Sequence, residues 1–188
     1  MTTILAIAGS PTYPSRTFSL LEYSTHQLQQ VGVQTETLSV RDIPSDVLAY
    51  GQYDSSALER PKQLLEQADG VIISTPIYKA AYTGVLKAFL DLLPQKSLVG
   101  KVVFPIATGG TIAHLLAIDY ALKPVLSELG ARHFISTVYA IDKQIQRQDD
   151  GSIRLEEELQ QRLNESLQEL VAAVSLAQVT PNVLPLAG

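Results

Sequence analysis

The residues best suited to chemistry lie in one short stretch near the start of the chain, residues 9–17. This stretch carries several hydroxyl side chains and one guanidinium, that of Arg16, and it contains no acid. It follows an apolar run typical of a buried strand and precedes a helical pattern, which predicts a strand-to-helix turn. Free N–H groups at a helix start, hydroxyl donors and a guanidinium together suit a phosphate group. The plainer alternative is an ordinary turn in which Ser15 caps the helix and Arg16 is solvated.

The turn does not match the common nucleotide-binding motifs. A dinucleotide fingerprint needs glycines that are missing after Gly9, and a Walker A loop needs a terminal Gly-Lys-Ser/Thr that is also missing. A magnesium-binding response regulator needs acids after its first strand, where this chain has Ala8, Gly9 and Ser10. What remains is a hydroxyl-rich loop around a monophosphate, which in a flavodoxin-like sheet indicates FMN.

Composition narrows the class of protein. The chain has 188 residues, of which 46% are hydrophobic and 18% charged, as expected of one domain with a sizeable core. A net charge of −5 argues against a nucleic-acid surface. The absence of cysteine excludes thiolate catalysis, and His26, His114 and His133 lack metal-ligand spacing, so no metal is expected. Without a membrane-length apolar run or a signal layout, we expect a cytoplasmic protein.

Strand and helix patterns alternate along the chain, which predicts a parallel sheet covered on both faces. The predicted strands are residues 4–8, 33–40, 70–75, 101–107 and 131–140, and the predicted helices are 18–31, 62–68, 83–93, 112–129 and 155–176. We expect an α/β fold with five parallel strands joined by right-handed crossovers. It forms a single domain over residues 1–188, with a non-helical tail at 178–188. Residues 41–61 are predicted to be irregular and to cover the ligand, and 144–152 to be a polar loop.

Three turns are expected to meet at the carboxyl edge of this sheet: residues 9–17, 75–84 and 107–111. In the second turn, Pro76 fixes a bend, and Tyr78 and Tyr82 could stack on a flat ring. In the third, Gly109 and Gly110 permit close approach of the backbone, whose N–H groups could stabilise negative charge on the ring. The alternatives are a simple tight turn for the glycines and a core or interface aromatic for Tyr78.

Several runs resemble a known family. They are residues 9–11, 15–16, 75–94, 107–111 and 114–126. Across residues 4–138 the chain is similar to the NADPH-dependent FMN reductases, most of all to those of alkanesulfonate utilisation (the SsuE type). The resemblance implies an α/β, flavodoxin-like fold with five parallel strands in the order 2-1-3-4-5. It implies reduction of FMN by NADPH or another reduced nicotinamide, and a homodimer or homotetramer. It also implies release of reduced flavin to a partner monooxygenase that liberates sulfite from alkanesulfonates.

The resemblance also implies the binding residues. For the phosphate of FMN they are Ser10, Thr12, Ser15, Arg16 and Thr17. For the flavin ring they are Pro76, Ile77, Tyr78, Lys79, Thr108, Gly109, Gly110 and Thr111. Many relatives have Arg at the position of Thr12, so the phosphate site is expected to be one charge short, with Arg16 as its only nearby cation. This favours weakly held, exchangeable FMN.

No catalytic acid or base is expected, because hydride passes directly from nicotinamide to flavin. His114 and Tyr120 are expected near the cofactor as supporting residues, with His114 packed rather than reactive. Two other functions share the fold: a quinone, azo-dye or chromate reductase with FMN as a prosthetic group, and a flavodoxin-like electron carrier. The sequence shows no cluster of Arg or Lys suited to bind the 2′-phosphate of NADPH, so the choice between NADPH and NADH stays open.

The predicted helix 112–129 contains a proline. Its expected inward stripe is Ile112, Leu115, Ile118, Leu122, Val125 and Leu129, and its outward side is Ala113, Ala117, Tyr120, Ala121 and Pro124. Pro124 cannot donate to the carbonyl of Tyr120, which predicts either a proline kink or a π-bulge. The family resemblance implies a π-bulge at Tyr120, and we expect it to place Tyr120 at a subunit interface near the flavin.

Overall fold

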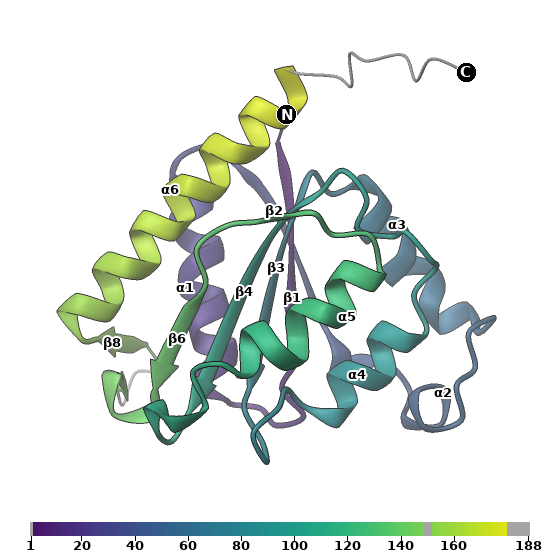
Figure 1. Cartoon of the computed structure of the whole chain (residues 1–188), viewed down its shortest axis with the longest axis horizontal. Helices are drawn as coiled ribbons and strands as arrows, with labels where there is room; N and C mark the ends of the chain where they lie inside the picture. Colours follow the sequence, from purple (N-terminus) through teal and green to yellow (C-terminus); the bar gives the residue numbers. More distant parts are fainter. Residues whose placement is uncertain (1, 149–151, 180–188) are drawn as a thin grey trace.

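The computed structural model describes residues 2–148 and 152–179 and shows a central sheet with helices on both sides (Figure 1). The strands are β1 (Thr3–Ala8), β2 (Gln34–Ser39), β3 (Gly70–Pro76), β4 (Val102–Gly109), β5 (His133–Phe134) and β6 (Val138–Ile141). They pair in parallel in the order β2-β1-β3-β4-β5, with β6 also on β4. The predicted flavodoxin-like fold and strand order are therefore confirmed.

The last predicted strand, 131–140, is present in two pieces. β5 pairs with Val102 and Val103, and β6 pairs with the segment from Ile106 to Gly109, so the two pieces follow the same edge of β4. Every residue of β3 and β4 is buried, as expected for strands covered on both faces, whereas β2 at the edge is partly exposed.

Two hydrophobic clusters fill the space above and below the sheet. One joins α1 (Arg16–Gln30) and α6 (Glu157–Val179) to one face. The other joins α3 (Glu59–Gln67), α4 (Gly84–Asp91) and α5 (Lys123–Glu128) to the opposite face, as Figure 1 shows. The amphipathic pattern of each helix decides which side it buries. The apolar stripe of α1 ends at Leu28, because Val31 is a C-cap residue that is 69% exposed.

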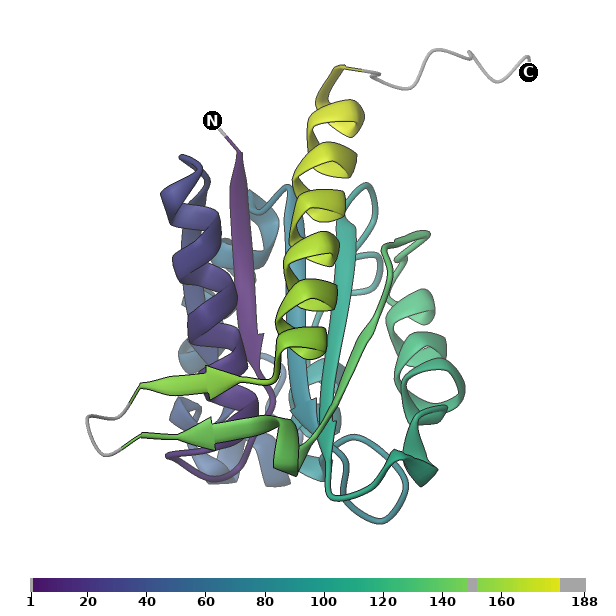
Figure 2. The ribbon, with the colours of Figure 1, turned by 90° about the vertical axis from the view of Figure 1, so that its left-hand side faces the viewer.

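Two segments are more regular than predicted. Residues 41–61 form short helical pieces, η1 (Val40–Asp42), α2 (Ser45–Ala49) and η2 (Ser56–Leu58), because Val47 and Leu58 are buried in the core. A polar loop was expected at 144–152, but three of these residues form β7 (Ile145–Arg147). This strand pairs with β8 (Ile153–Leu155) as an antiparallel hairpin. Figure 2 shows this hairpin at the carboxyl end of the sheet, beside the start of α1. Its buried Ile145 and Leu155 fix it to the core.

The predicted helix 112–129 is interrupted, not continuous. It begins with the 3-10 turn η3 (Ile112–His114), passes through the π-helical segment η4 (Ile118–Leu122), and ends as α5. The predicted π-bulge at Tyr120 is thus present. The inward stripe holds from Ile118 onward but is wrong for Ile112 and Leu115, which are exposed.

The chain's last helix also differs from expectation. α6 extends to Val179, so a non-helical tail beginning at residue 178 is wrong at its first two positions. The remainder of that predicted tail, 180–188, lies outside the described residues. Across the parts of the chain that the structure covers, every helix is too short or too polar to span a bilayer.

Candidate functional site

A cavity of about 330 Å³ opens where β1, β3 and β4 end. It is lined by residues from all three predicted turns: Ser10, Thr12, Ser15, Arg16, Thr17, Pro76, Ile77, Tyr78, Thr108, Gly109 and Gly110. Parallel strands bring their carboxyl ends to one edge, so turns far apart in sequence share one hollow. Of the residues predicted to bind the cofactor, only Lys79 and Thr111 do not line it.

The first turn presents hydroxyls and backbone donors to this cavity. Ser15 caps α1, its hydroxyl oxygen accepting from the N–H of Phe18 at 3.1 Å, so the capping role weighed above is real. Its O–H can still donate to a ligand. The N–H groups of Arg16 and Thr17 belong to the first turn of the helix, where no carbonyl of the helix itself can satisfy them. Together these groups form a site suited to an anion.

Hydrogen bonds beneath the cavity tie the turn to the sheet. The hydroxyls of Thr17 and Thr108 lie 2.6 Å apart, which joins the start of α1 to the end of β4. The Ser74 hydroxyl donates to the carbonyl of Thr17 at 3.0 Å, and the Thr83 hydroxyl donates to the carbonyl of Gly9 at 2.6 Å. These side chains are buried. The base of the cavity is therefore held in place before any ligand arrives.

Three lining residues were missed from the sequence: Pro14, Asp142 and Arg147. Asp142 lies 3.7 Å from the guanidinium of Arg16, and both side chains are about half exposed. Arg147, on β7, adds a second guanidinium. The expectation that Arg16 is the only cation near the phosphate site is thus wrong. The alternation of apolar and polar residues in 153–155 (Ile-Arg-Leu) was the available signal for the hairpin that brings Arg147 there, whereas 145–147 (Ile-Gln-Arg) shows no such alternation.

The glycine turn after β4 has a structural reason as well as a chemical one. A Cβ at Gly109 would overlap the hydroxyl of Tyr139, whereas a Cβ at Gly110 would meet open space. That hydroxyl donates to the carbonyl of Thr111 at 2.8 Å, and Thr111 does not line the cavity. Burial, followed by the nearby Asp142 carboxylate, raises the pKa of Tyr139, so the phenol remains a donor.

The second turn holds Lys79 away from the cavity. Tyr78 and Ala81 exchange backbone hydrogen bonds of 2.8 and 3.2 Å, which closes a two-residue reversal. Lys79 and Ala80 form its tip with φ of 51° and 65°, a conformation that L-residues rarely adopt. Lys79 is exposed at this tip, while Tyr78 lines the cavity and is 48% exposed. Tyr82 packs against the core instead of lining the cavity.

Other predicted features lie outside the cavity lining. His114 is exposed, so the expectation that it is packed is wrong, and Tyr120 is 79% exposed. Residues 41–61, all of them described, supply none of the residues that line the cavity, so their expected role as a cover over the bound ligand stays a prediction. Within this segment, Arg41 lies over the ring of Tyr13, 5.6 Å from its centroid. The described residues contain no cluster of His, Cys, Asp or Glu able to hold a metal.

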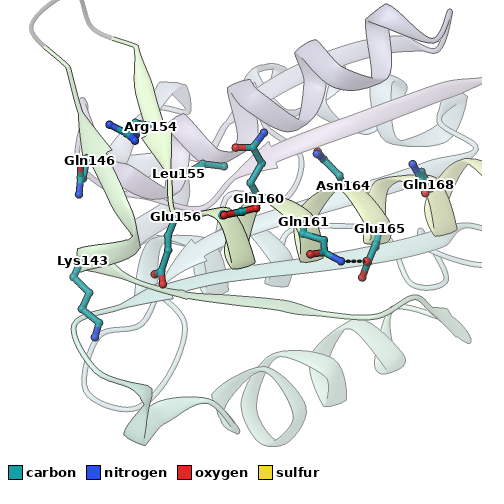
Figure 3. A pocket seen from close by; sticks show the side chains of 11 residues that line it. Lys143, Gln146, Arg154, Leu155, Glu156, Gln160, Gln161, Asn164, Glu165 and Gln168 are labelled. Atoms are coloured by element: carbon teal, nitrogen blue, oxygen red, sulfur yellow. Dashed lines mark hydrogen bonds between the residues drawn. The ribbon is translucent and has the colours of Figure 1, made fainter.

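A larger hollow of about 1190 Å³ lies between the β7–β8 hairpin and α6. Figure 3 shows it lined mainly by glutamine and glutamate side chains, with Lys143 and Arg154 at the hairpin end. It contains none of the residues singled out from the sequence, and it lacks the glycine turn and helix start that suit a phosphorylated ring. The smaller cavity is therefore the candidate site, because its donor set fits both the phosphate and the flat ring of FMN.

Comparison with known proteins bears directly on this site. Residues 2–146 match the model of the NADPH-dependent FMN reductase family. The chain belongs to this family. It is 51% identical over 142 residues to an FMN reductase (NADPH) of Escherichia coli, covering 76% of this chain and 74% of that one. It is 45% identical over 184 residues to an FMN reductase (NADPH) of Pseudomonas putida, covering 96% and 93%.

A solved structure supports the same assignment. The apo form of the NADH:FMN oxidoreductase EMOB is 36% identical, with a TM-score of 0.82, and the match covers 92% of this chain and 90% of that chain. The family uses FMN as the flavin and NADPH as the reductant. The protein is therefore an oxidoreductase, which removes the electron-carrier alternative.

Proposed function

We propose that this protein takes FMN as an exchangeable substrate, reduces it with NAD(P)H, and supplies the reduced flavin to a flavin-dependent monooxygenase of alkanesulfonate sulfur assimilation. The observation that carries the proposal is the cavity at the carboxyl edge, where the turns singled out from the sequence meet in a member of the FMN reductase family. Extended similarity to FMN reductases of the alkanesulfonate type, over the runs quoted above, supports the choice of pathway.

The hydrogen-bond donors of the cavity indicate which part of FMN each turn would bind. The start of α1, with the hydroxyls of Ser10, Thr12 and Ser15, would bind the phosphate. The backbone of 108–110 would lie against the ring, where N–H groups stabilise negative charge. Bound FMN supplies the chemistry, accepting a hydride from the reduced nicotinamide. The protein stacks and orients the two rings and needs no acid or base of its own.

Exchange of the flavin is supported by the exposure of the site. Thr12, Pro14 and Tyr78 are exposed lining residues, so the cavity is open to solvent on several sides. Asp142 among the lining residues repels a phosphate and offsets part of the positive charge. Both features favour modest affinity, as a flavin that is released after reduction requires.

We also propose that the chain forms a homodimer or homotetramer through what we call the 112–120 face. This face consists of Ile112, Leu115, Leu116 and Tyr120, which are between 45% and 79% exposed. Exposed apolar side chains gathered on one segment favour association with another subunit. The segment begins two residues after Gly110 of the cavity, so such an interface would border the flavin site.

Steady-state kinetics on flavin-stripped protein test the function. We expect NAD(P)H oxidation to saturate with free FMN and to follow a sequential pattern, and we expect reduced FMN to be passed on when a monooxygenase is added. A protein that purifies yellow, retains FMN through dialysis and shows ping-pong kinetics with quinones or azo dyes would instead support the prosthetic-group alternative. Comparing NADPH with NADH in the same assay decides the nicotinamide preference.

A further inference from the structure

The β7–β8 hairpin brings a charged residue to the cavity from a part of the chain beyond the matched family region. The family model ends at residue 146, and Arg147 follows immediately. Side chains alternate along a strand, so Arg147 shares a face with Ile145, whose side chain is buried in the core. Gln146 and its register partner Arg154 take the other face and line the hollow beside α6 (Figure 3).

The charges around the cavity show why this residue matters. Arg16 has a carboxylate at 3.7 Å, that of Asp142, so this pair contributes little net charge. Arg147 is the remaining charged residue of the lining. A phosphate monoester carries about −1.5 to −2 charge near neutral pH. Without Arg147 the lining would be close to neutral and would offer such a group hydrogen bonds but no net attraction.

Building on the proposed function, we propose that Arg147 is the specificity-determining cation that distinguishes FMN from unphosphorylated riboflavin. Its guanidinium complements the charge of the 5′-phosphate at the start of α1 and replaces the positive charge that Thr12 does not supply. The hairpin is then part of the flavin-binding site. Ile145 and Leu155, which fix the hairpin to the core, position Arg147.

Fluorescence titration of the flavin-stripped full-length protein tests this assignment. Arg147→Gln is expected to raise the Kd for FMN about tenfold, the scale of one lost charge-assisted hydrogen bond, and to leave the Kd for riboflavin within a factor of two. Arg147→Lys is expected to retain part of the preference, because it keeps the charge but loses the planar fork. Arg154→Gln is the matched control, on the same hairpin but the opposite face, and should change neither Kd.

Salt dependence provides a second readout. The affinity of the wild type for FMN should fall as ionic strength rises, and Arg147→Gln should show a weaker dependence. An unchanged Kd for FMN in Arg147→Gln, or equal losses for FMN and riboflavin, would overturn the assignment. So would an Arg154→Gln variant that behaves like Arg147→Gln, since that would indicate a general effect on the hairpin.

The test separates this inference from the proposed function. If the wild type oxidises NAD(P)H with free FMN but Arg147→Gln keeps its FMN affinity, the inference alone fails. If the wild type binds FMN but does not reduce it, the proposed function fails, and the titrations still decide the role of Arg147.

Discussion

At the scale of single residues, the chemistry of the cavity depends on a small set of charges and hydroxyls. Arg16 was singled out from the sequence as the cation of the phosphate site, and the structure places Asp142 beside it. A half-exposed ion pair of this kind stabilises the fold little. Its importance is local, because it sets how much of the charge of Arg16 a ligand experiences.

Substitutions in this pair should move FMN binding in opposite directions. Arg16→Ala removes a donor and leaves Asp142 facing the phosphate, so binding of FMN should weaken by about 1–3 kcal/mol. Asp142→Asn removes a repulsion and should strengthen binding by less than about 1 kcal/mol, since the groups are partly solvated. Titrations with FMN and riboflavin measure both changes, and riboflavin should be nearly indifferent. Equal losses for the two flavins in Arg16→Ala would contradict the phosphate assignment.

Tyr139 gives a prediction with a pH dependence. Its hydroxyl donates to the carbonyl of Thr111, so Tyr139→Phe should lower the free energy of unfolding by about 1 kcal/mol near neutral pH. Burial raises the pKa of Tyr139 above its ordinary value of 10.0, so above pH 10 the folded protein holds a proton that the unfolded chain has released. The stability of the wild type must then fall as pH rises further.

The stability advantage of the wild type over Tyr139→Phe should therefore be constant below pH 10 and shrink above it. Urea unfolding of both proteins at pH 8 and at pH 10.5 measures the difference. An advantage that stays the same at both values would show that the raised pKa of Tyr139 is not coupled to folding. Comparing the two proteins cancels the titration of the other groups.

At the scale of elements, two segments depart from regular geometry beside the site. Pro124 removes one backbone donor in the helix after β4, and the chain responds with the π-helical segment η4. The turn at 78–81 reverses the chain with two non-glycine residues at positive φ. Such a turn ordinarily uses Asn-Gly, so the sequence accepts strain there, next to the expected position of the flavin ring.

Ala80→Gly should relieve part of this strain. An L-residue in the left-handed region costs roughly 1 kcal/mol relative to glycine, which for a chain of this size corresponds to an increase in Tm of about 2–4 °C. Ala81→Gly is the matched control: Ala81 is not among the residues with positive φ, so glycine there should lower the Tm slightly. Thermal unfolding of the three proteins checks this, and equal shifts in the two variants would contradict the argument.

At the scale of the whole molecule, the sheet is protected on both faces by separate clusters, whereas the 112–120 face is left uncovered in the single chain. The α1–α6 side and the α3–α4–α5 side each bury their apolar stripes against the sheet. The exposed Leu116 and Tyr120 therefore have no role in stabilising the single chain, which favours a role in assembly.

The assembly is testable by light scattering after size-exclusion chromatography. We expect the wild type to elute as a dimer or tetramer, and the double variant Leu116→Ser/Tyr120→Ser to shift toward the monomer. The matched control is Tyr50→Ser/Tyr53→Ser, which alters two tyrosines that are 80% and 70% exposed on a different segment. A monomeric wild type at micromolar concentration, or a control that dissociates as much as the test variant, would contradict an interface at this face.

The patterns of the sequence by themselves determined the parallel sheet and the meeting of the three turns, and the family resemblance implied the strand order. Apolar runs separated by amphipathic helices leave few ways to bury both faces of a sheet, and parallel strands must place their carboxyl ends at one edge. The hydroxyls of residues 10–17 and the glycines at 109 and 110 therefore reach the same cavity. An irregularity in the helix after β4 was also predictable, because Pro124 acts on a neighbouring turn of its own helix, and the family resemblance favoured a π-bulge over a kink.

Only the tertiary structure decided the contacts between residues far apart in the chain. Asp142 and Arg147 join Arg16 because a short hairpin, fixed by Ile145 and Leu155, crosses the carboxyl end of the sheet. Lys79 lies outside the cavity lining, at the tip of a tight turn whose residues have positive φ. This turn was not predicted, because a turn without glycine or asparagine carries little local signal of positive φ. The exposure of Ile112 and Leu115 depends on where the helix after β4 begins to pack. Local patterns specify elements, but the charge balance of a site is set by which elements the fold brings together.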